Sequence, residues 1–498
     1  MNSRFFGSCS VELILKIGEA LNLEDLKRIR LTCQLFASIF ADRVLHSICI
    51  FDKPIRSNEH PFGLQSLINR QNAICYHTKS VTIGYPQLNA SKDQEASLET
   101  AVIQKYVVAA LLSCEKLERL IANHPGWMTA AVIELINTLP NLRHLEVHVE
   151  ILSKGLKTKN LSASLESLSV TTPNSSHFFT TISNLIASSP HLTSINVNNT
   201  RDLSYVWNKS ENLHALFAGL SGHQPRSFRH ISLSGVLVRF DSTTLPHLQS
   251  LVSLSIINRW CRNDQISEYP DVCSPSSALW EALQQSGVQL QELEHDNISN
   301  SLIKYISSLT RLRSLKLAVQ CIRGKRLSDT LAHNFFRVLP QHACTLEELV
   351  ITSAYEGLWC FREEAFREIF QQGRLKQLSL SMNACLPMKD TIDDEDNAMT
   401  HLIDSVSNHL PDLEALAVHT AWPESSRGAR CGTGAVTHEM WTFNQLAKCI
   451  RAHRMPKSCI APPRLVLKKL YEPDALLFLA QVDATKGGRL RYNDVPYS

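Results

Sequence analysis

The chain has 498 residues, 44% of them hydrophobic, and its 50 lysines and arginines nearly balance its 47 aspartates and glutamates. The apolar fraction suffices for a large core and excludes wholesale disorder, while a formal net charge of +3 gives no global field for nucleic-acid binding. No run of about 18 uncharged apolar residues is present, and Glu12 and Lys16 interrupt the first apolar run. We therefore expect no membrane span, no signal peptide, and a location in the cytoplasm, the nucleus or both.

Three amphipathic helices are predicted within the first fifty residues. They cover residues 10–21, 24–33 and 35–47. In the first helix the polar residues Glu12, Lys16 and Glu19 form one narrow stripe, and apolar residues cover almost all of the rest. A helix that packs on one side needs an apolar arc of only about 100°. This surplus predicts a permanent docking face for another protein, since three short helices alone make a marginal core.

The same helices carry a pattern of specific residues, namely Glu12, Asp25-Leu26, Leu31, Cys33 and Phe36. In this pattern the segment resembles an F-box, although Cys9-Ser10 stands where that family has Leu-Pro. A serine at position 10 suits the N-cap of a helix. The resemblance implies that residues 1–50 dock on a Skp-type adaptor and, through it, on a cullin. The residues implied to contact the adaptor are Cys9, Ser10, Ile14, Leu26, Leu31 and Phe36.

A short repeat, L-x-x-L-x-L with substitutions, covers most of the remaining chain. Its eleven copies begin at residues 117, 142, 165, 192, 228, 251, 290, 312, 346, 375 and 413. A weaker copy lies at 79–83, and successive spacings run from 22 to 39 residues. Each copy is predicted to be a strand, because its apolar residues alternate.

Helical periodicity is present between many of these strands. The predicted helices are 101–113, 129–138, 178–187, 278–285, 302–307, 363–371 and 399–408. A helix–loop–strand unit cannot bury its own apolar face, so neighbouring units must stack. The fold class is therefore α/β: a solenoid with parallel strands on its concave side and helices on its convex side. An ordinary α/β enzyme whose strands begin with leucine is the alternative.

The repeats resemble irregular leucine-rich repeats over about residues 77–480, and only the copy at 375 has that family's closing asparagine, Asn383. The predicted domains are an F-box-like helical domain (1–50), a linker or helix (51–76), the repeat solenoid (77–480) and a C-terminal tail (481–498). Segments 258–277, 385–397 and 422–439 are predicted to be exposed insertions, and the chain from about residue 461 is predicted to cap the array.

On the concave face we expect the third, fifth and seventh residues of each motif, because the leucines point inward. These positions are polar, with an acidic patch around Glu292–Asp296. The candidate substrate-binding residues are His144, Glu146, His148, Glu292, Glu294, Asp296, Lys316, Glu348 and His419.

Catalytic and metal-binding motifs are not found. The 14 cysteines contain no C-x-x-C pair, and His144 and His148 lie on a predicted strand without the glutamate of H-E-x-x-H. We therefore expect no metal, no cofactor and no enzymatic activity.

An F-box followed by leucine-rich repeats resembles the substrate receptors of cullin–RING (SCF-type) ubiquitin ligases, whose repeats bind a target protein. The alternative is a leucine-rich interaction scaffold that is not coupled to ubiquitination.

Overall fold

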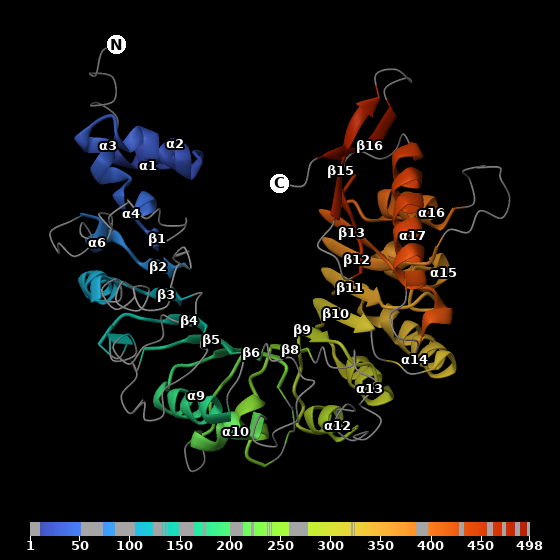
Figure 1. Cartoon of the computed structure of the whole chain (residues 1–498), viewed down its shortest axis with the longest axis horizontal. Helices are drawn as coiled ribbons and strands as arrows, with labels where there is room; N and C mark the ends of the chain where they lie inside the picture. The colour runs from blue at the N-terminus through green and yellow to red at the C-terminus, as the bar shows by residue number, and fades with distance from the viewer. Residues whose placement is uncertain are drawn as a thin grey trace. The chain divides into compact units, whose positions relative to one another are not determined.

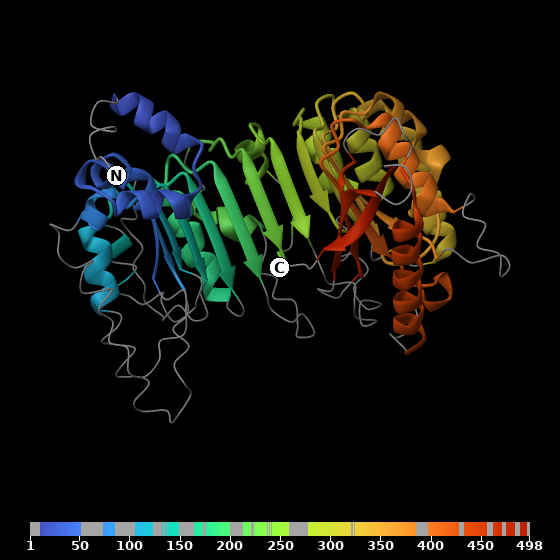
Figure 2. The same ribbon diagram turned by 90° about the horizontal axis from the view of Figure 1, so that it is seen from above.

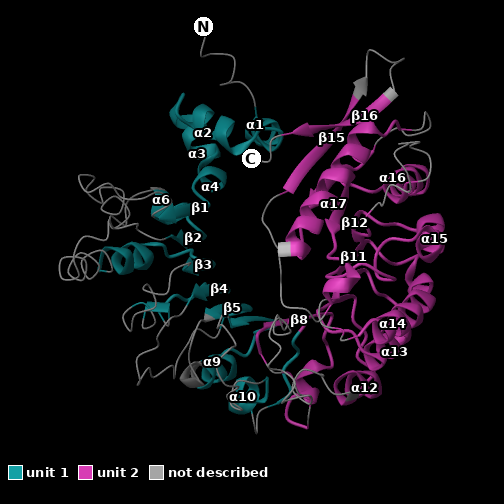
Figure 3. Ribbon diagram, turned by 45° about the vertical axis from the view of Figure 1, so that its right-hand side comes forward, with its two compact units in different colours: residues 1–202, 207–228 teal, residues 203–206, 229–498 magenta. Residues whose placement is uncertain are grey.

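The computed structural model describes most of the chain in two compact units (Figure 3). The first unit comprises residues 1–202 and 207–228, and the second 203–206 and 229–498. The described residues are 10–50, 73–84, 105–122, 138–148, 164–172, 176–199, 213–220, 224–236, 242–257, 277–319, 324–384, 397–427, 433–455, 462–470, 475–483 and 489–495, with a few single positions between them.

The first unit begins with four short helices. They are α1 (Val11–Glu19), α2 (Leu23–Arg30), α3 (Gln34–Ile39) and α4 (Ala41–Val44). Side-chain caps start the first two: the Leu13 N–H donates to Ser10 Oγ at 3.3 Å, as expected for Ser10, and the Asp25 N–H donates to Asn22 Oδ1 at 2.9 Å.

The helix predicted over 35–47 is wrong in two respects. It is interrupted at Phe40, whose φ of −96° and ψ of 4° lie outside the α region. It also ends at Val44, because Ser47–Ile50 is a strand, β1, that pairs in parallel with the next strand of the sheet. The sheet therefore begins before the predicted boundary at residue 50.

The rest of the first unit alternates helices with parallel strands. After β1 come α6 (Ala73–His77), β2 (Ser80–Ile83), β3 (Arg119–Ala122), β4 (His144–His148), β5 (Ser167–Thr172), α9 (Ser176–Ser188), β6 (Ser194–Asn199), α10 (Leu213–Phe217) and η3 (Ala218–Leu220). Strands β1 to β6 pair in chain order and all in parallel, and their arrows point the same way (Figure 2).

The second unit continues the alternation. Its elements are β7 (His230–Ser234), η4 (Leu245–Leu248), β8 (Ser253–Ile257), α12 (Ser277–Gln285), β9 (Glu292–His295), α13 (Asn300–Ser308), β10 (Ser314–Val319), α14 (Lys325–Val338), η7 (Leu339–His342), β11 (Glu348–Ser353), α15 (Glu363–Gln372), β12 (Gln377–Met382), α16 (Ala398–His409), β13 (Ala415–Thr420), η9 (Glu424–Ser426), α17 (Thr433–Ala452), β14 (Arg464–Lys468), β15 (Ala475–Asp483) and β16 (Arg489–Val495). Strands β7 to β14 are parallel, whereas β15 and β16 are antiparallel and end the sheet.

The repeat prediction is confirmed at every copy: each of the eleven motifs contains a strand that begins at the motif's third residue. The first, fourth and sixth motif residues are buried in all of them. Motif pairs with motif in register, for example Leu120 with Leu145 and Leu145 with Leu168. Within each unit the helices lie on one side of the strands (Figure 1), so the sheet is an α/β arrangement compatible with a solenoid.

Several predicted helices are confirmed within two residues, namely 178–187, 278–285, 302–307, 363–371 and 399–408. Residues 105–113 of the helix predicted over 101–113 are helical. Most of 129–138 lies outside the described residues, as does all but the last residue of each of the predicted insertions 258–277 and 385–397. Helix α14 was not predicted. It follows Gly324, whose φ of 82° favours a residue without a Cβ.

The predicted exposed insertion at 422–439 is wrong over its second half, which begins helix α17. Glu439 is buried there because three donors bind its carboxylate. They are Thr420 Oγ1 at 2.9 Å, Trp422 Nε1 at 3.1 Å and the Leu470 N–H at 2.6 Å. Charge and glycine content therefore misled the prediction, because this charge is satisfied inside the protein. None of the helices that the structure describes is long and apolar enough to span a bilayer.

Residues at the second motif position form a polar ladder where the strands begin. The Arg143 N–H donates to the Glu118 carbonyl, and the Glu118 N–H to the Lys79 carbonyl, each at 2.8 Å. The side chains also alternate in charge, with Lys79 and Glu118 2.9 Å apart. Such exposed pairs add little stability. The stacking of neighbouring repeats is therefore stabilised mainly by the buried motif leucines.

We expect Leu315→Ala to lower the free energy of unfolding of the second unit by about 2–5 kcal/mol, because this fully buried side chain would leave a cavity. Urea unfolding followed by hydrogen exchange of residues 314–353 measures the change. The control is Leu327→Ala at a half-exposed position of α14, for which we expect a change within about 0.5 kcal/mol. Equal effects of the two variants would contradict the packing described.

Candidate functional site

The N-terminal helices share a small apolar cluster of their own. Ile14, Leu26 and Phe40 are buried at its centre, and Leu21, Ile29, Phe36, Ile39 and Val44 pack around them. Gly18 permits this packing, because a Cβ there would stand only 2.5 Å from a ring carbon of Phe40. The cluster therefore uses just one side of α1.

Helix α1 nevertheless has a much wider apolar arc. At 100° per residue, the arc from Leu13 and Ile17 across Ile14 to Val11 and Leu15 covers about 200°. Ile14 lies in the middle and is buried, whereas the four flanking side chains are between 39% and 49% exposed. The helix thus exposes apolar side chains on both flanks of its buried face, and Leu31 (85% exposed) and Leu35 (41%) extend the exposed apolar area to the following segments.

We call Val11, Leu13, Leu15, Ile17, Leu31 and Leu35 together the apolar helix surface. Exposed apolar side chains gathered on so small a bundle are typical of an interaction site rather than of a solvated surface. Docking would bury the exposed part of each side chain, which for the half-buried side chains of α1 contributes about 1 kcal/mol each.

The six adaptor-binding candidates divide between surface and interior. Leu31 is exposed, Ser10 is exposed and caps α1, and Phe36 is half-buried against Phe40, with 6.0 Å between the ring centroids. Cys9 lies outside the described residues.

Ile14 and Leu26 were expected to be anchors on the docking face. The structure differs from this expectation, because both side chains are buried in the cluster. They support the surface from beneath. The exposed residues Val11, Leu13, Leu15 and Ile17 were not among the predicted contact residues, although the two-sided apolar arc is the signal that identifies them.

The three substrate candidates in the first unit lie along β4. His144 is exposed, and Glu146 and His148 are half-buried. Glu146 lies 3.9 Å from Arg119 on the neighbouring strand, so part of its charge is already balanced within the protein.

In the second unit the predicted acidic patch is smaller than expected. Glu292 is exposed, and Glu294 is half-buried and accepts a hydrogen bond from Ser255 Oγ at 2.7 Å. Asp296 was expected on the accessible face, but the structure buries it, with only 4% of its surface exposed. Strand β9 ends at His295, so the alternation that would place residue 296 on the accessible face no longer applies.

The other candidates pair with neighbours. Lys316 and Glu348 form an ion pair of 2.8 Å across β10 and β11. His419 Nε2 lies 2.9 Å from Ser379 Oγ, and burial, with Lys468 nearby, lowers the pKa of His419 to about 4. His419 is therefore a neutral hydrogen-bonding group at pH 7. No set of three metal-ligating side chains gathers in the described part of the chain.

A comparison with known protein families and with curated proteins found no match to this chain.

His295 occupies the last apolar position of its motif, and its ring is fully buried. Its Nδ1–H donates to the Ile256 carbonyl at 2.8 Å, and the Trp280 ring packs edge-on with centroids 5.2 Å apart. Burial lowers the pKa of His295 to about 4, although the Ile256 carbonyl opposes this effect. The ring is thus held neutral, in place of a leucine.

Because the pKa of His295 is lower in the folded than in the unfolded state, the unfolded state binds more protons between about pH 6.5 and pH 4. The free energy of unfolding of the second unit should therefore decrease as the pH is lowered from about 6.5 to about 4, by up to about 1.4 kcal/mol per pH unit from this group. We expect His295→Leu to flatten the pH dependence of the urea midpoint of residues 292–319. Parallel curves for the two proteins would refute this assignment.

Proposed function

We propose that this protein is the substrate-recognition subunit of an SCF-type cullin–RING ubiquitin ligase. In this proposal the N-terminal helices are an F-box that binds a Skp-type adaptor, and the strand array is a leucine-rich-repeat solenoid that binds a target protein. The observation that carries it is the wide apolar arc of α1, whose buried middle lies between two exposed flanks. A helix that packs on one face and has apolar side chains on both flanks of that face can also pack against helices of a partner protein.

The repeats support the second half of the proposal. The strands of the stacked repeats lie on the side opposite the helices (Figure 1). The motif residues between the buried positions are mostly polar and differ from repeat to repeat, whereas the buried positions are apolar in every repeat except at His295. Extended surfaces of this type bind proteins by many contacts around a few anchors.

The receptor makes or breaks no bond in this mechanism. It holds a target near a ubiquitin-loaded enzyme bound elsewhere on the complex, so its contribution is effective concentration. The adaptor contact should be a largely apolar interface of standard size, about 800 Å² on each partner.

The test is binding of the purified full-length chain to a Skp-type adaptor. We expect Leu13→Asp combined with Ile17→Asp to weaken binding at least about a hundredfold, because each substitution places a charge in an apolar interface. Both side chains are exposed, so the helices should remain folded. Ile14→Asp would not distinguish the possibilities, because this residue is buried in the cluster and its substitution would unfold the helices.

Leu327→Asp, at a half-exposed apolar position of α14 in the second unit, is the matched control and should bind the adaptor normally. If the wild-type chain does not bind the adaptor, or if the double variant binds as well as the wild type, the ligase assignment is wrong.

A further inference from the structure

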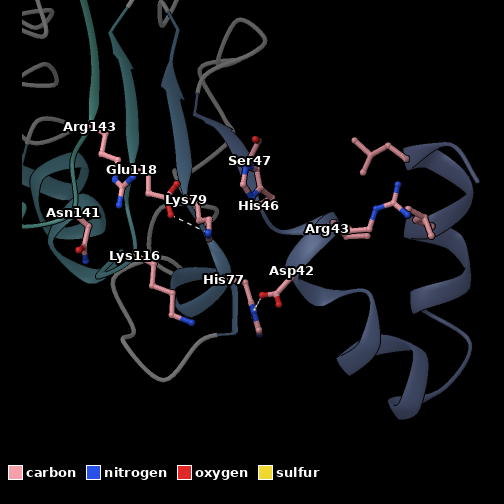
Figure 4. Close-up of a pocket in the computed structure, with 13 residues that line it drawn as sticks. Asp42, Arg43, His46, Ser47, His77, Lys79, Lys116, Glu118, Asn141 and Arg143 are labelled. Carbon is pink, nitrogen blue, oxygen red and sulfur yellow. Dashed lines mark hydrogen bonds and ion pairs between the residues drawn. The ribbon is translucent and has the colours of Figure 1, made fainter. Parts of the chain in front are cut away.

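A cleft of about 930 Å³ lies within the first unit (Figure 4). One wall is formed by α2 and α4, and the other by the residues where β1 to β4 begin. This volume is in the range of sites that hold a ligand or a short peptide segment. The cleft is separate from the apolar helix surface, since no residue of that surface lines it.

The cleft carries an excess of positive charge. Its lining includes four permanent cations, Arg43, Lys79, Lys116 and Arg143, against the two carboxylates of Asp42 and Glu118. His46 and His77 add two groups that gain positive charge when protonated.

Both carboxylates already have partners. Asp42 pairs with His77 Nδ1 at 2.5 Å and Glu118 with Lys79 at 2.9 Å, and the hydrogen bond from Lys79 keeps the pKa of Glu118 below its ordinary value. Both acids of the cleft are therefore engaged, and its lining still holds four permanent cations against these two carboxylates.

Lys116 and Arg43 have no carboxylate partner among the described residues. Lys116 Nζ stands 3.7 Å from the centroid of the Tyr76 ring, and Arg43 Nη1 donates to the Gly18 carbonyl. The third cation, Arg143, lies 3.4 Å from Glu166, a residue that does not line the cleft, and its charge also helps to lower the pKa of Glu118. As Figure 4 shows, Arg43 extends from the helical wall, and Lys116 and Arg143 belong to the opposite wall.

The helical wall also has an apolar part. Leu23 is half-exposed, and Val44 and Leu26 continue the apolar lining behind it. A ligand that fits this cleft therefore combines negative charge with an apolar group.

We propose that this cleft binds a protein segment that carries phosphate or carboxylate groups next to a leucine-like side chain. Lys116 and Arg143 contact the anionic groups from the strand wall, and Leu23 and Val44 contact the apolar side chain. Charge-assisted hydrogen bonds from arginine and lysine are the strongest available to phosphate oxygens. The site does not depend on adaptor binding, so it can be tested separately from the proposed function.

The experiment uses the full-length chain and a fluorescein-labelled pool of decapeptides with two fixed phosphoserines beside a fixed leucine. We expect binding by fluorescence anisotropy at low salt that weakens steeply as salt is added. Lys116→Gln combined with Arg143→Gln should weaken it about tenfold or more. The matched control is Lys304→Gln combined with Arg367→Gln, which removes the same charge at exposed helical positions of the second unit and should leave binding unchanged.

Three results would overturn the proposal. These are no binding of the pool at about millimolar peptide, equal loss in the cleft and control variants, and displacement by inorganic phosphate at the same concentration as by unlabelled peptide. The last result would identify a small-anion site instead of a peptide site. A matching pool with serine in place of phosphoserine should bind more weakly, and more weakly still when leucine is replaced by serine.

Discussion

The structure depends on the stacking of apolar strand residues between neighbouring repeats. A single helix–loop–strand unit exposes its leucines to water, whereas in the stack the fourth motif residue of one strand lies in register with that of the next. Every motif residue that faces the interior is thereby removed from solvent, and the residues between them remain at least partly accessible except Ser255 and Ser379. The regular burial of one set of side chains is what leaves the other set available for binding.

The N-terminal helices, in contrast, bury only part of their apolar surface. They are too few to form a large core, and their cluster around Ile14, Leu26 and Phe40 uses only the middle of the apolar arc of α1. Leucine and isoleucine side chains on its two flanks stay exposed in the chain alone. An arrangement of this kind is stable in water only at a cost that a bound partner would remove, and this reasoning underlies the proposed adaptor role.

The repeat architecture could be predicted from the sequence because it is specified by local alternation, and the strands begin where the motif requires. Predictions failed where long-range contacts override local pattern. Glu439, in a segment predicted to be exposed, is buried because Thr420, Trp422 and the backbone N–H of Leu470 donate to its carboxylate. Asp296 is buried because the strand ends one residue earlier. Periodicity also showed that α1 is apolar on too many sides, but it could not show which side its own cluster would occupy. The cationic cleft had no sequence signal, since its residues lie at separate strand starts that only the fold brings together.

Hydrogen–deuterium exchange of the full-length chain, with and without a Skp-type adaptor, shows whether the N-terminal helices bind that adaptor. We expect amides of α1 and of the segment around Leu31 and Leu35 to gain protection when the adaptor is added, while strands β7 to β14 exchange as before. Unchanged exchange in α1 at saturating adaptor, or protection confined to the strands, would contradict this expectation.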